Sequence, residues 1–96
     1  MYNRIQTATT TTLIQSRNIY GGSIKKISVC NNSLEEATID LFVEDDDTNV
    51  HFIVKNLVIP SGVTLILEDN IDFDDLVYSL KLTNSGTSPD LSIIIK

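Results

Sequence analysis

This chain of 96 residues is long enough for one small domain and too short for two. A domain of this length buries roughly 60–65% of its unfolded surface, which supports one modest core and makes a deep substrate cleft hard to build. Its 7 Lys and Arg residues against 13 Asp and Glu residues give a formal net charge of −6, and this acidity disfavours nucleic acid as a partner.

The first stretch, residues 1–16, is rich in threonine, with Thr7 and Thr9–Thr12 among few apolar residues. It lacks the apolar run of a signal peptide, and no apolar run in the chain is long enough to span a bilayer, so we expect no membrane partner. Threonine favours extended backbone but contributes little apolar area. We therefore expect an edge strand of the same chain in preference to an arm that pairs with a neighbouring protein. If the stretch is an arm, deleting residues 1–12 should leave the fold largely intact.

Apolar and polar residues alternate with a period of two along most of the remaining chain, which predicts half-buried β-strands. The alternating segments are residues 26–30, 37–44, 50–55, 63–68, 76–83 and 91–96. The segments that begin at Ala37 and Leu76 alternate most regularly, so we expect them at the centre of the sheets. Ile24 is out of phase with the strand that follows it, which predicts a β-bulge near Lys25.

Residues typical of turns separate these segments. They are Gly21-Gly22, Asn31-Asn32-Ser33, Asp45 to Asn49, Pro60-Ser61-Gly62 and Asn84 to Asp90. No segment shows helical periodicity over more than a turn or two, and residues 70–75 allow one short helical turn at most.

About seven to eight short strands with this spacing predict a single all-β domain over residues 1–96. The expected architecture is an antiparallel β-sandwich of jelly-roll or immunoglobulin-like type. The alternation also predicts which apolar side chains face inward to form its core. They are Ile39, Leu41, Val43, Leu65, Leu80 and Ile93.

Catalytic chemistry has few candidate residues. His51 is the only histidine and Cys30 the only cysteine. We expect His51 to be a surface residue beside Lys55, and no helix N-terminus or basic cluster is predicted near Cys30 to activate its thiol. No phosphate-binding glycine loop and no Gly-x-Ser-x-Gly motif is present. We therefore predict no enzymatic activity, no catalytic residues and no cofactor.

Nine of the 13 acidic residues fall into two runs. The first run is Glu44, Asp45, Asp46 and Asp47, and the second is Glu68, Asp69, Asp72, Asp74 and Asp75. A calcium site needs several oxygen ligands that converge on one point, and the second run lacks the glycine and the closing glutamate of an EF-hand loop. Two acidic loops at one end of a sandwich could share an ion, but we expect solvated loops that oppose aggregation and no metal site.

The turn Pro60-Ser61-Gly62 stands inside an aliphatic segment that runs from Asn56 to Leu67. In these residues the chain resembles small β-sandwich virion proteins of tailed bacteriophages, especially those of marine and cyanobacterial phages. The order of the other parts is also similar to theirs. These parts are a Thr-rich start at 9–14, a strand that ends in Asn at 27–31, a hairpin at 37–54, an acidic link at 69–75 and two closing strands within 77–95. Several usual glycines of the acidic link are replaced here by Phe73-Asp74-Asp75.

The resemblance implies a structural protein located in the virion, with no catalytic residues. Its first implied role is capsid decoration, in which the chain binds the major capsid protein or other virion proteins and self-associates, for instance as a homotrimer. A position in the neck, tail or baseplate is the alternative within this class. A module that binds carbohydrate or a host surface is the alternative from another class, and it would use exposed aromatic residues such as Tyr2 and Tyr20.

Overall fold

The computed structural model of the chain describes residues 2–17, 23–68, 71–74, 76–86 and 88–96. Within these residues the chain forms ten strands and no helix, which confirms the expected all-β class. The strands are β1 (Tyr2–Ile5), β2 (Thr10–Ile14), β3 (Ser23–Ile24), β4 (Ile27–Asn31), β5 (Ala37–Glu44), β6 (Val50–Ile59), β7 (Thr64–Leu67), β8 (Ile71–Asp72), β9 (Ser79–Ser85) and β10 (Leu91–Ile95). None of the described segments is a helix that could cross a membrane.

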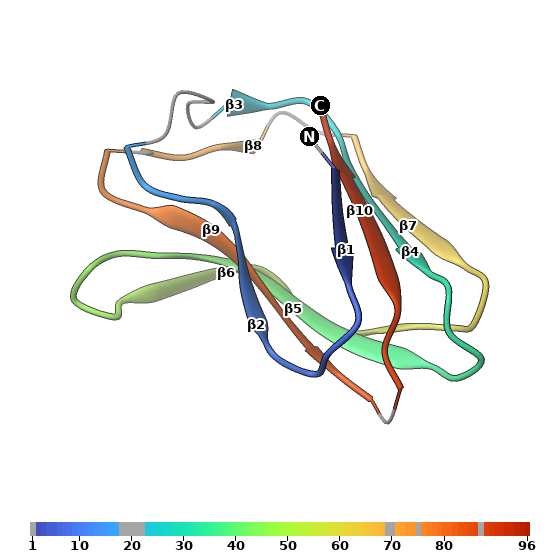
Figure 1. Ribbon diagram of the computed structural model, residues 1–96. Helices are drawn as coiled ribbons and strands as arrows, with labels where there is room; N and C mark the ends of the chain where they lie inside the picture. The colour runs from blue at the N-terminus through green and yellow to red at the C-terminus, as the bar shows by residue number, and fades with distance from the viewer. Residues whose placement is uncertain (1, 18–22, 69–70, 75, 87) are drawn as a thin grey trace.

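Eight of the strands form two antiparallel sheets that pack face to face (Figure 1). Sheet A has the order β1-β10-β4-β7 and sheet B the order β2-β9-β5-β6, while β3 pairs with β8 at the top of Figure 1. If β3 and β8 are left out and the other strands are numbered in chain order, the two sheets read 1-8-3-6 and 2-7-4-5. This is the jelly-roll order, in which successive strands cross repeatedly between the sheets. The expected sandwich is therefore confirmed, and its strand order is that of a jelly roll.

The core lies between the two sheets and is aliphatic. Ile39, Leu41, Leu80 and Ile93 are at most 1% exposed, and Val43 is 8% exposed. The sixth predicted core residue, Leu65, packs against this cluster but stays partly exposed, because β7 is an edge strand.

The two strands that alternate most regularly, β5 and β9, are the central pair of sheet B, as predicted. However, β9 begins at Ser79 and not at Leu76. Leu76 and Val77 are exposed because Asp74 forms a turn there: its carboxylate accepts the Leu76 N–H at 3.1 Å and its carbonyl accepts the Val77 N–H at 3.1 Å. The predicted strand began too early because alternation alone does not reveal this turn.

Bulges or register shifts interrupt the regular pairing at several places, including Lys25, β2 and the β5–β6 pair. The backbone N–H groups of Lys25 and Lys26 both donate to the Lys96 carbonyl, at 3.0 and 3.3 Å, so two residues oppose one and the predicted bulge at Lys25 is confirmed. In sheet B, the 8 residues of β5 face the 10 residues of β6. The register shows that the two extra residues fall near Ile53 and Asn56. The sequence predicted this strand only over residues 50–55.

The Thr-rich start of the chain forms two edge strands within this fold. β1 pairs with β10 in sheet A and β2 pairs with β9 in sheet B. Ile5 and Ile14 are buried in the core, so the stretch is part of the sandwich, and we now expect that removing residues 1–12 would cost stability. Residues 71–72 form strand β8 where the sequence allowed a helical turn, and Gly21-Gly22 lies outside the described residues.

Candidate functional site

The two candidate catalytic residues lie in different sheets. Cys30 is on β4 of sheet A, partly buried, with its thiol donating to the Asn32 side-chain oxygen at 3.4 Å. His51 is on β6 of sheet B, exposed, with its ring edge-on to Tyr78 at a centroid distance of 5.6 Å. The structure therefore does not bring a thiol and an imidazole together. Lys55, expected beside His51, instead stacks on Phe52, because the bulge near Ile53 shifts the strand by one residue.

The first acidic run shapes a turn. The Asp45 carboxylate accepts the backbone N–H groups of Asp47 and Asn49, at 3.0 and 2.9 Å, and the Asn49 side-chain amide at 3.0 Å. These hydrogen bonds, above all the one from the Asn49 side chain, lower the pKa of Asp45 below its ordinary value. Glu44 forms an ion pair with Lys81 at 2.6 Å. Asp45 therefore has partners that shape the β5–β6 turn, and Glu44 has a partner that joins β5 to β9.

The second acidic run is described only in part, since Asp69 and Asp75 lie outside the described residues. Asp74 caps the turn before β9, and Glu68 is exposed at the end of β7. Across the described chain, no three His, Cys, Asp or Glu side chains come close enough together to hold a metal ion.

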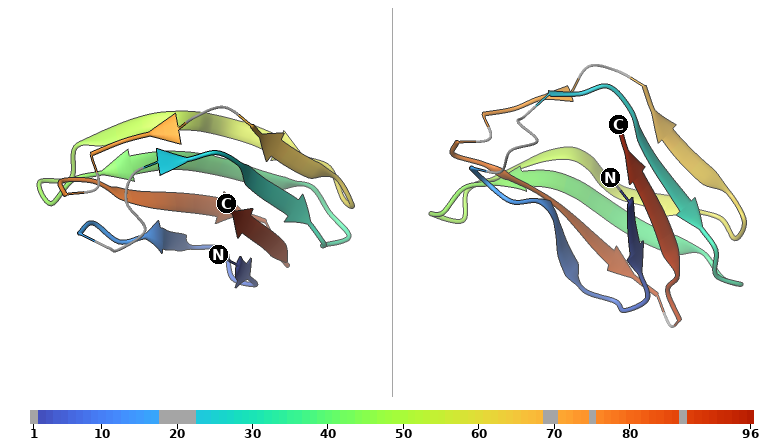
Figure 2. Two further views of the ribbon diagram at one scale, coloured as in Figure 1. Left: turned by 90° about the horizontal axis from the view of Figure 1, so that it is seen from above. Right: turned by 45° about the horizontal axis from the view of Figure 1, so that its top comes forward.

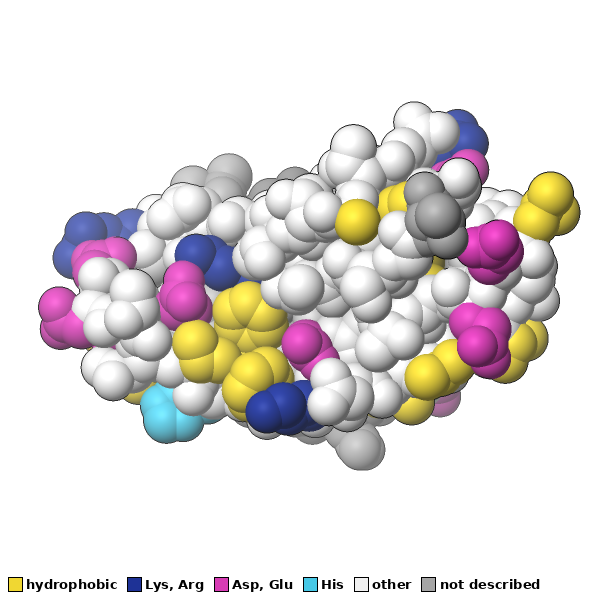
Figure 3. Space-filling view, turned by 90° about the horizontal axis from the view of Figure 1, so that it is seen from below, with side chains coloured by type: hydrophobic (Ala, Val, Ile, Leu, Met, Phe, Trp, Pro, Cys, Tyr) yellow, Lys and Arg dark blue, Asp and Glu magenta, His cyan; other side chains and the backbone are white. Residues whose placement is uncertain are grey.

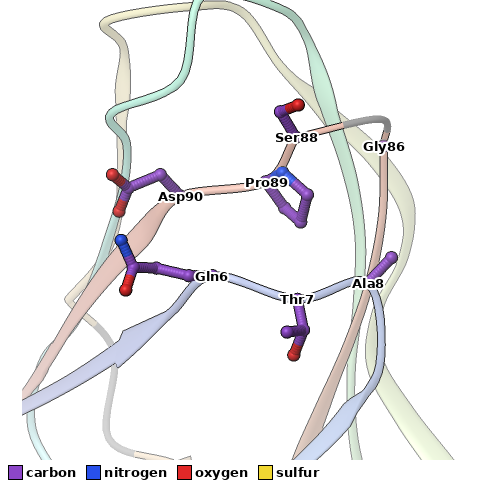
Figure 4. A pocket seen from close by; sticks show the side chains of 7 residues that line it. All are labelled: Gln6, Thr7, Ala8, Gly86, Ser88, Pro89 and Asp90. Atoms are coloured by element: carbon purple, nitrogen blue, oxygen red, sulfur yellow. The ribbon is translucent and has the colours of Figure 1, made fainter.

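An open groove of about 530 Å³ lies between the β1–β2 connection and the β9–β10 connection (Figure 4). It is lined by Gln6, Thr7, Ala8, Gly86, Ser88, Pro89 and Asp90. Asp90, at one end of the groove, is held by Arg4 through two hydrogen bonds of 3.0 and 2.9 Å. The Arg4 guanidinium lowers the pKa of Asp90 and keeps this carboxylate ionised. The charged group of the groove is thus used to join β1 to β10.

Most of the large exposed apolar side chains in the described residues belong to strands or a turn on one side of the sandwich. Seen from above, β6 and β7 lie along one side and β1 and β2 along the other (Figure 2, left). We call these the β6–β7 side and the β1–β2 side. Five of the nine large exposed hydrophobic residues in the described chain belong to β6, to β7 or to the turn between them. They are Phe52, Ile53, Val58, Val63 and Ile66.

The core is also less completely covered on the β6–β7 side. Apolar residues there that pack against the core remain partly exposed: Val54, Leu57, Leu65 and Leu67. On the β1–β2 side, by contrast, Leu13 and Ile14 are 2% and 1% exposed. Apolar surface that is incompletely buried is typical of sites where another protein binds.

The outer face of sheet B carries an aromatic pair beside this side. The rings of Phe42 and Phe52 lie 5.7 Å apart, and the Lys55 ammonium sits 4.6 Å from the centre of the Phe52 ring. Figure 3 views this face and shows apolar side chains close to the one histidine and surrounded by charged side chains. An apolar centre with a charged rim is the usual composition of a protein–protein contact surface.

The charges around the β6–β7 side are mostly acidic. The turn before β6 contains Asp45, Asp46 and Asp47, and Glu68 follows β7. Glu35 and Glu36 line one open hollow together with Ser61 of the β6–β7 turn. Lys55 is the only basic residue on the two strands. This side therefore presents apolar groups between acidic ends.

Of the two aromatic residues proposed for sugar binding, the structure describes one. Tyr2 is 78% exposed on β1 and borders an open hollow of about 420 Å³ that Arg4, Ser92 and Ile94 also line. Tyr20 lies outside the described residues.

Sequence reasoning missed the role of Asn31, which it placed in a turn. Asn31 is fully buried, and its side-chain amide donates to the carbonyls of Glu35 and Ile59 at 2.8 and 2.9 Å. Its side-chain oxygen accepts the Ser33 hydroxyl at 2.6 Å. The sequence signal was an asparagine that ends a strand in phase with the buried residues Ile27 and Val29. A polar residue at an inward position requires buried partners.

Comparisons with known proteins bear on the fold. No protein-family model matches the sequence, and no curated protein matches it. Among solved structures, the crystal structure of PirA is similar at a TM-score of 0.66 and 14% identity, over 100% of this chain and 92% of that one. The Anabaena sensory rhodopsin transducer follows at 0.49 and 14% identity, over 92% of this chain and 80% of that one. Infectious bursal disease virus, Gx strain, matches at 0.44 and 11% identity, over 97% of this chain and 26% of that one.

At these identities the similarity to PirA shows a shared fold and nothing about function. It covers nearly all of both chains, so the two-sheet arrangement described above is a known one. We conclude that the chain is an antiparallel β-sandwich whose candidate functional surface is the apolar β6–β7 side.

Proposed function

We propose that this chain is a non-enzymatic structural protein of a virion that decorates the capsid by binding the major capsid protein. The observation that carries the proposal is the apolar β6–β7 side, where Phe52, Val58 and Ile66 are each nearly half exposed. A small domain that leaves such residues in water gains stability when another protein covers them. The resemblance of residues 56–67 to phage virion proteins supplies the kind of partner.

The fold agrees with this proposal without requiring it. Jelly-roll sandwiches occur in viral capsid proteins, in lectins and in other classes. In this chain one carboxylate of the groove, Asp90, and one of the acidic turn, Asp45, already have partners within the fold. The apolar side is the surface that still has an interaction to make.

The direct test is mass spectrometry of purified virions from the source of this sequence, which we expect to detect the chain in many copies. Recombinant chain added to particles that lack it should bind and saturate. A double variant, Phe52→Ser with Ile66→Ser, should bind at least about tenfold more weakly, because two apolar contacts are lost. Tyr2→Ser on the opposite side is the matched control and should bind normally. Absence of the chain from purified virions would refute the proposal.

The same particles separate the positions that the proposal leaves open. Tailless heads that retain the chain support capsid decoration, whereas retention only on isolated tails supports a neck, tail or baseplate position. Light scattering of the free chain measures whether it forms the expected homotrimer.

A carbohydrate-binding module is the second candidate function, and one observation favours it. Tyr2 is exposed beside a hollow that also presents the Arg4 and Ser92 side chains, and an exposed aromatic ring with polar neighbours is suited to stacking on a sugar. A glycan array scored against Tyr2→Ala tests this candidate. Specific binding that the variant loses would support it, and no binding to any glycan would exclude it.

A further inference from the structure

A sandwich of two open sheets has four edge strands, and three of these carry features that prevent pairing with another chain. β2 has a register shift between Thr12 and Ile14, and β6 has two bulges. β1 carries the charged Arg4 on its short edge. Bulges and charged side chains are the usual protection of an edge strand.

The fourth edge strand, β7, lacks both features. It pairs with β4 in one unbroken register, from Ile27 with Leu67 to Cys30 with Thr64. Its sequence, Thr-Leu-Ile-Leu, contains no charge and no proline. β7 therefore presents a regular, apolar edge, and its length of 4 residues limits what pairs with it to one short segment.

The register identifies which backbone groups of β7 are free to pair. Asn31 donates its backbone N–H to the Val63 carbonyl at 3.0 Å, so hydrogen-bonded pairs in this ladder include the position of Val63. Because such pairs alternate along an antiparallel ladder, Leu65 and Leu67 bond to β4. The N–H and C=O groups of Thr64 and Ile66 then point away from β4.

The inner surface beside β7 is apolar and would be covered best by apolar side chains. Leu65 and Leu67 face the core but are only partly buried. A strand added beyond β7 would extend sheet A, and every second side chain of that strand would lie over this gap. The added segment should therefore be apolar at alternate positions.

Acidic residues stand at both ends of β7. Glu68 follows its last residue. At its start, Ser61 donates its hydroxyl to the Ser33 carbonyl at 2.6 Å and lines a hollow with Glu35 and Glu36. A partner segment with lysine or arginine at both ends would match these charges.

A second copy of this chain fits less well. Symmetric antiparallel pairing of two β7 strands would bring Glu68 of each copy to the Ser61 end of the other, where Glu35 and Glu36 lie. Like charges would then face each other at both ends of the contact, between molecules that each carry a net charge of −6.

We propose that β7 binds an extended segment of another protein by strand addition, the segment being apolar at alternate positions and basic at both ends. Backbone hydrogen bonds to Thr64 and Ile66 supply the pairing, and contact with Leu65 and Leu67 supplies the specificity. This deepens the proposed function, since it specifies the part of the partner that attaches. The test uses the isolated chain, so its result is independent of whether the chain occurs in virions.

The probe is a short acetylated peptide in which valine and threonine alternate and lysines stand at both ends. We expect it to slow amide hydrogen exchange at Thr64 and Ile66 by about tenfold when about nine-tenths of the chain is bound. Amides of β1, the other regular edge, should exchange at an unchanged rate. The same peptide with glutamates in place of the lysines should bind at least about tenfold more weakly at low salt.

The variant Ile66→Pro removes one outward N–H without removing a bond to β4, a position at which a strand tolerates proline. It should abolish peptide binding while keeping the parent circular dichroism spectrum. Ile66→Lys, which keeps the N–H, serves as a second variant if the proline variant fails to fold, and it should weaken binding of the lysine peptide. Tyr2→Lys on the β1 edge is the matched control and should bind the peptide normally.

Three results would overturn the proposal. The first is unchanged exchange at Thr64 and Ile66 with saturating lysine peptide. The second is peptide protection centred on β6. The third is protection of Thr64 and Ile66 that grows with protein concentration in the absence of peptide, which would identify a second copy as the occupant.

Discussion

The two sides of the sandwich are built from similar strands, but they bury the edge of the core to different extents. On the β1–β2 side, Ile5, Leu13 and Ile14 are almost fully buried, and threonines cover the outer surface of β2. On the β6–β7 side, Leu65 and Leu67 remain partly exposed. Edge strands can therefore complete a core or leave part of it open, and the position of their large apolar side chains decides which.

Each side also has one buried asparagine that ties a connection to the core. Asn31 on β4 binds the Glu35 and Ile59 carbonyls beside the β6–β7 turn. Asn84 on β9 binds the Thr7 carbonyl in the β1–β2 connection at 3.1 Å, but its buried side-chain oxygen has no partner. The side that leaves apolar surface exposed is thus the one with the better satisfied polar anchor. A rigid, partly open side is what a preformed binding surface requires.

Removing residues 1–12 should have the largest effect. The deletion removes β1 with the buried Ile5 and most of β2, so both sheets lose an edge and the core is opened on its closed side. The loss should be comparable with the whole stability of a small domain, about 5–15 kcal/mol. Circular dichroism and binding of a hydrophobic dye measure it. A truncated chain with a cooperative, near-parent melting transition would show that the β1–β2 side does not close the core.

Alanine substitutions on the two sides should differ in size. Ile14→Ala removes methyl groups from a site that is 1% exposed and should destabilise the chain by about 2–5 kcal/mol. Leu65→Ala acts at a partly exposed site and should destabilise it by about 1 kcal/mol. Urea unfolding of both variants gives the comparison. Equal losses would mean that the β6–β7 side is as completely packed as the other.

The sequence predicted the elements that depend on alternation alone. The strand at 37–44 has its predicted bounds, and Ile39, Leu41 and Leu80 are core residues as expected. Inward positions of a regular strand are an even number of residues apart, so Ile24, three residues before the inward Ile27, revealed the bulge at Lys25. These features follow from local periodicity.

The rest depends on partners that are distant in sequence. The bulges near Ile53 and Asn56 follow from pairing with β5, and Asp40 stabilises one of them by accepting the Asn56 N–H at 2.7 Å. From the sequence alone Asn31 is interpreted as a turn residue. Its role becomes visible only when the fold brings Ile59 beside it. For the same reason, the sequence did not predict the open β6–β7 side. Alternation shows which face of a strand is apolar but not which strands form the edges of the sheets.

Substitution of the two buried asparagines should destabilise the chain to different extents. Asn31→Ala leaves the buried Ile59 carbonyl and the part-buried Glu35 carbonyl without the amide donor and should destabilise the chain by about 1–3 kcal/mol. Asn84→Ala removes a group that is already incompletely satisfied, and its effect should be about 1 kcal/mol or less. Urea unfolding measures both. A larger loss for Asn84→Ala would reverse the assignment of the stronger anchor.

The smallest expected effect concerns pH. Hydrogen bonds hold the pKa of Asp90 and of Asp45 below their ordinary values, through Arg4 and Asn49 respectively. A carboxyl whose pKa is lowered on folding stabilises the folded state above its unfolded pKa, near 3.8, and loses this contribution as pH falls through the lower folded pKa. Asp90→Asn and Asp45→Asn should each flatten the fall in melting temperature below about pH 4.

Salt should distinguish the two carboxyls, because Asp90 is held mainly by the charged Arg4, whereas Asp45 is held mainly by the neutral Asn49 and least by the charge of His51. Added sodium chloride should shrink the difference between parent and Asp90→Asn and leave the Asp45→Asn difference nearly unchanged, since Asn49 is neutral. Both carboxyls are exposed, so the differences should be small, and melting curves at matched pH with and without salt are the measurement. Equal salt sensitivity would mean that the Arg4–Asp90 pair does not persist in solution. The edge of β1 would then be held by its backbone pairing with β10 and by Ile5 alone.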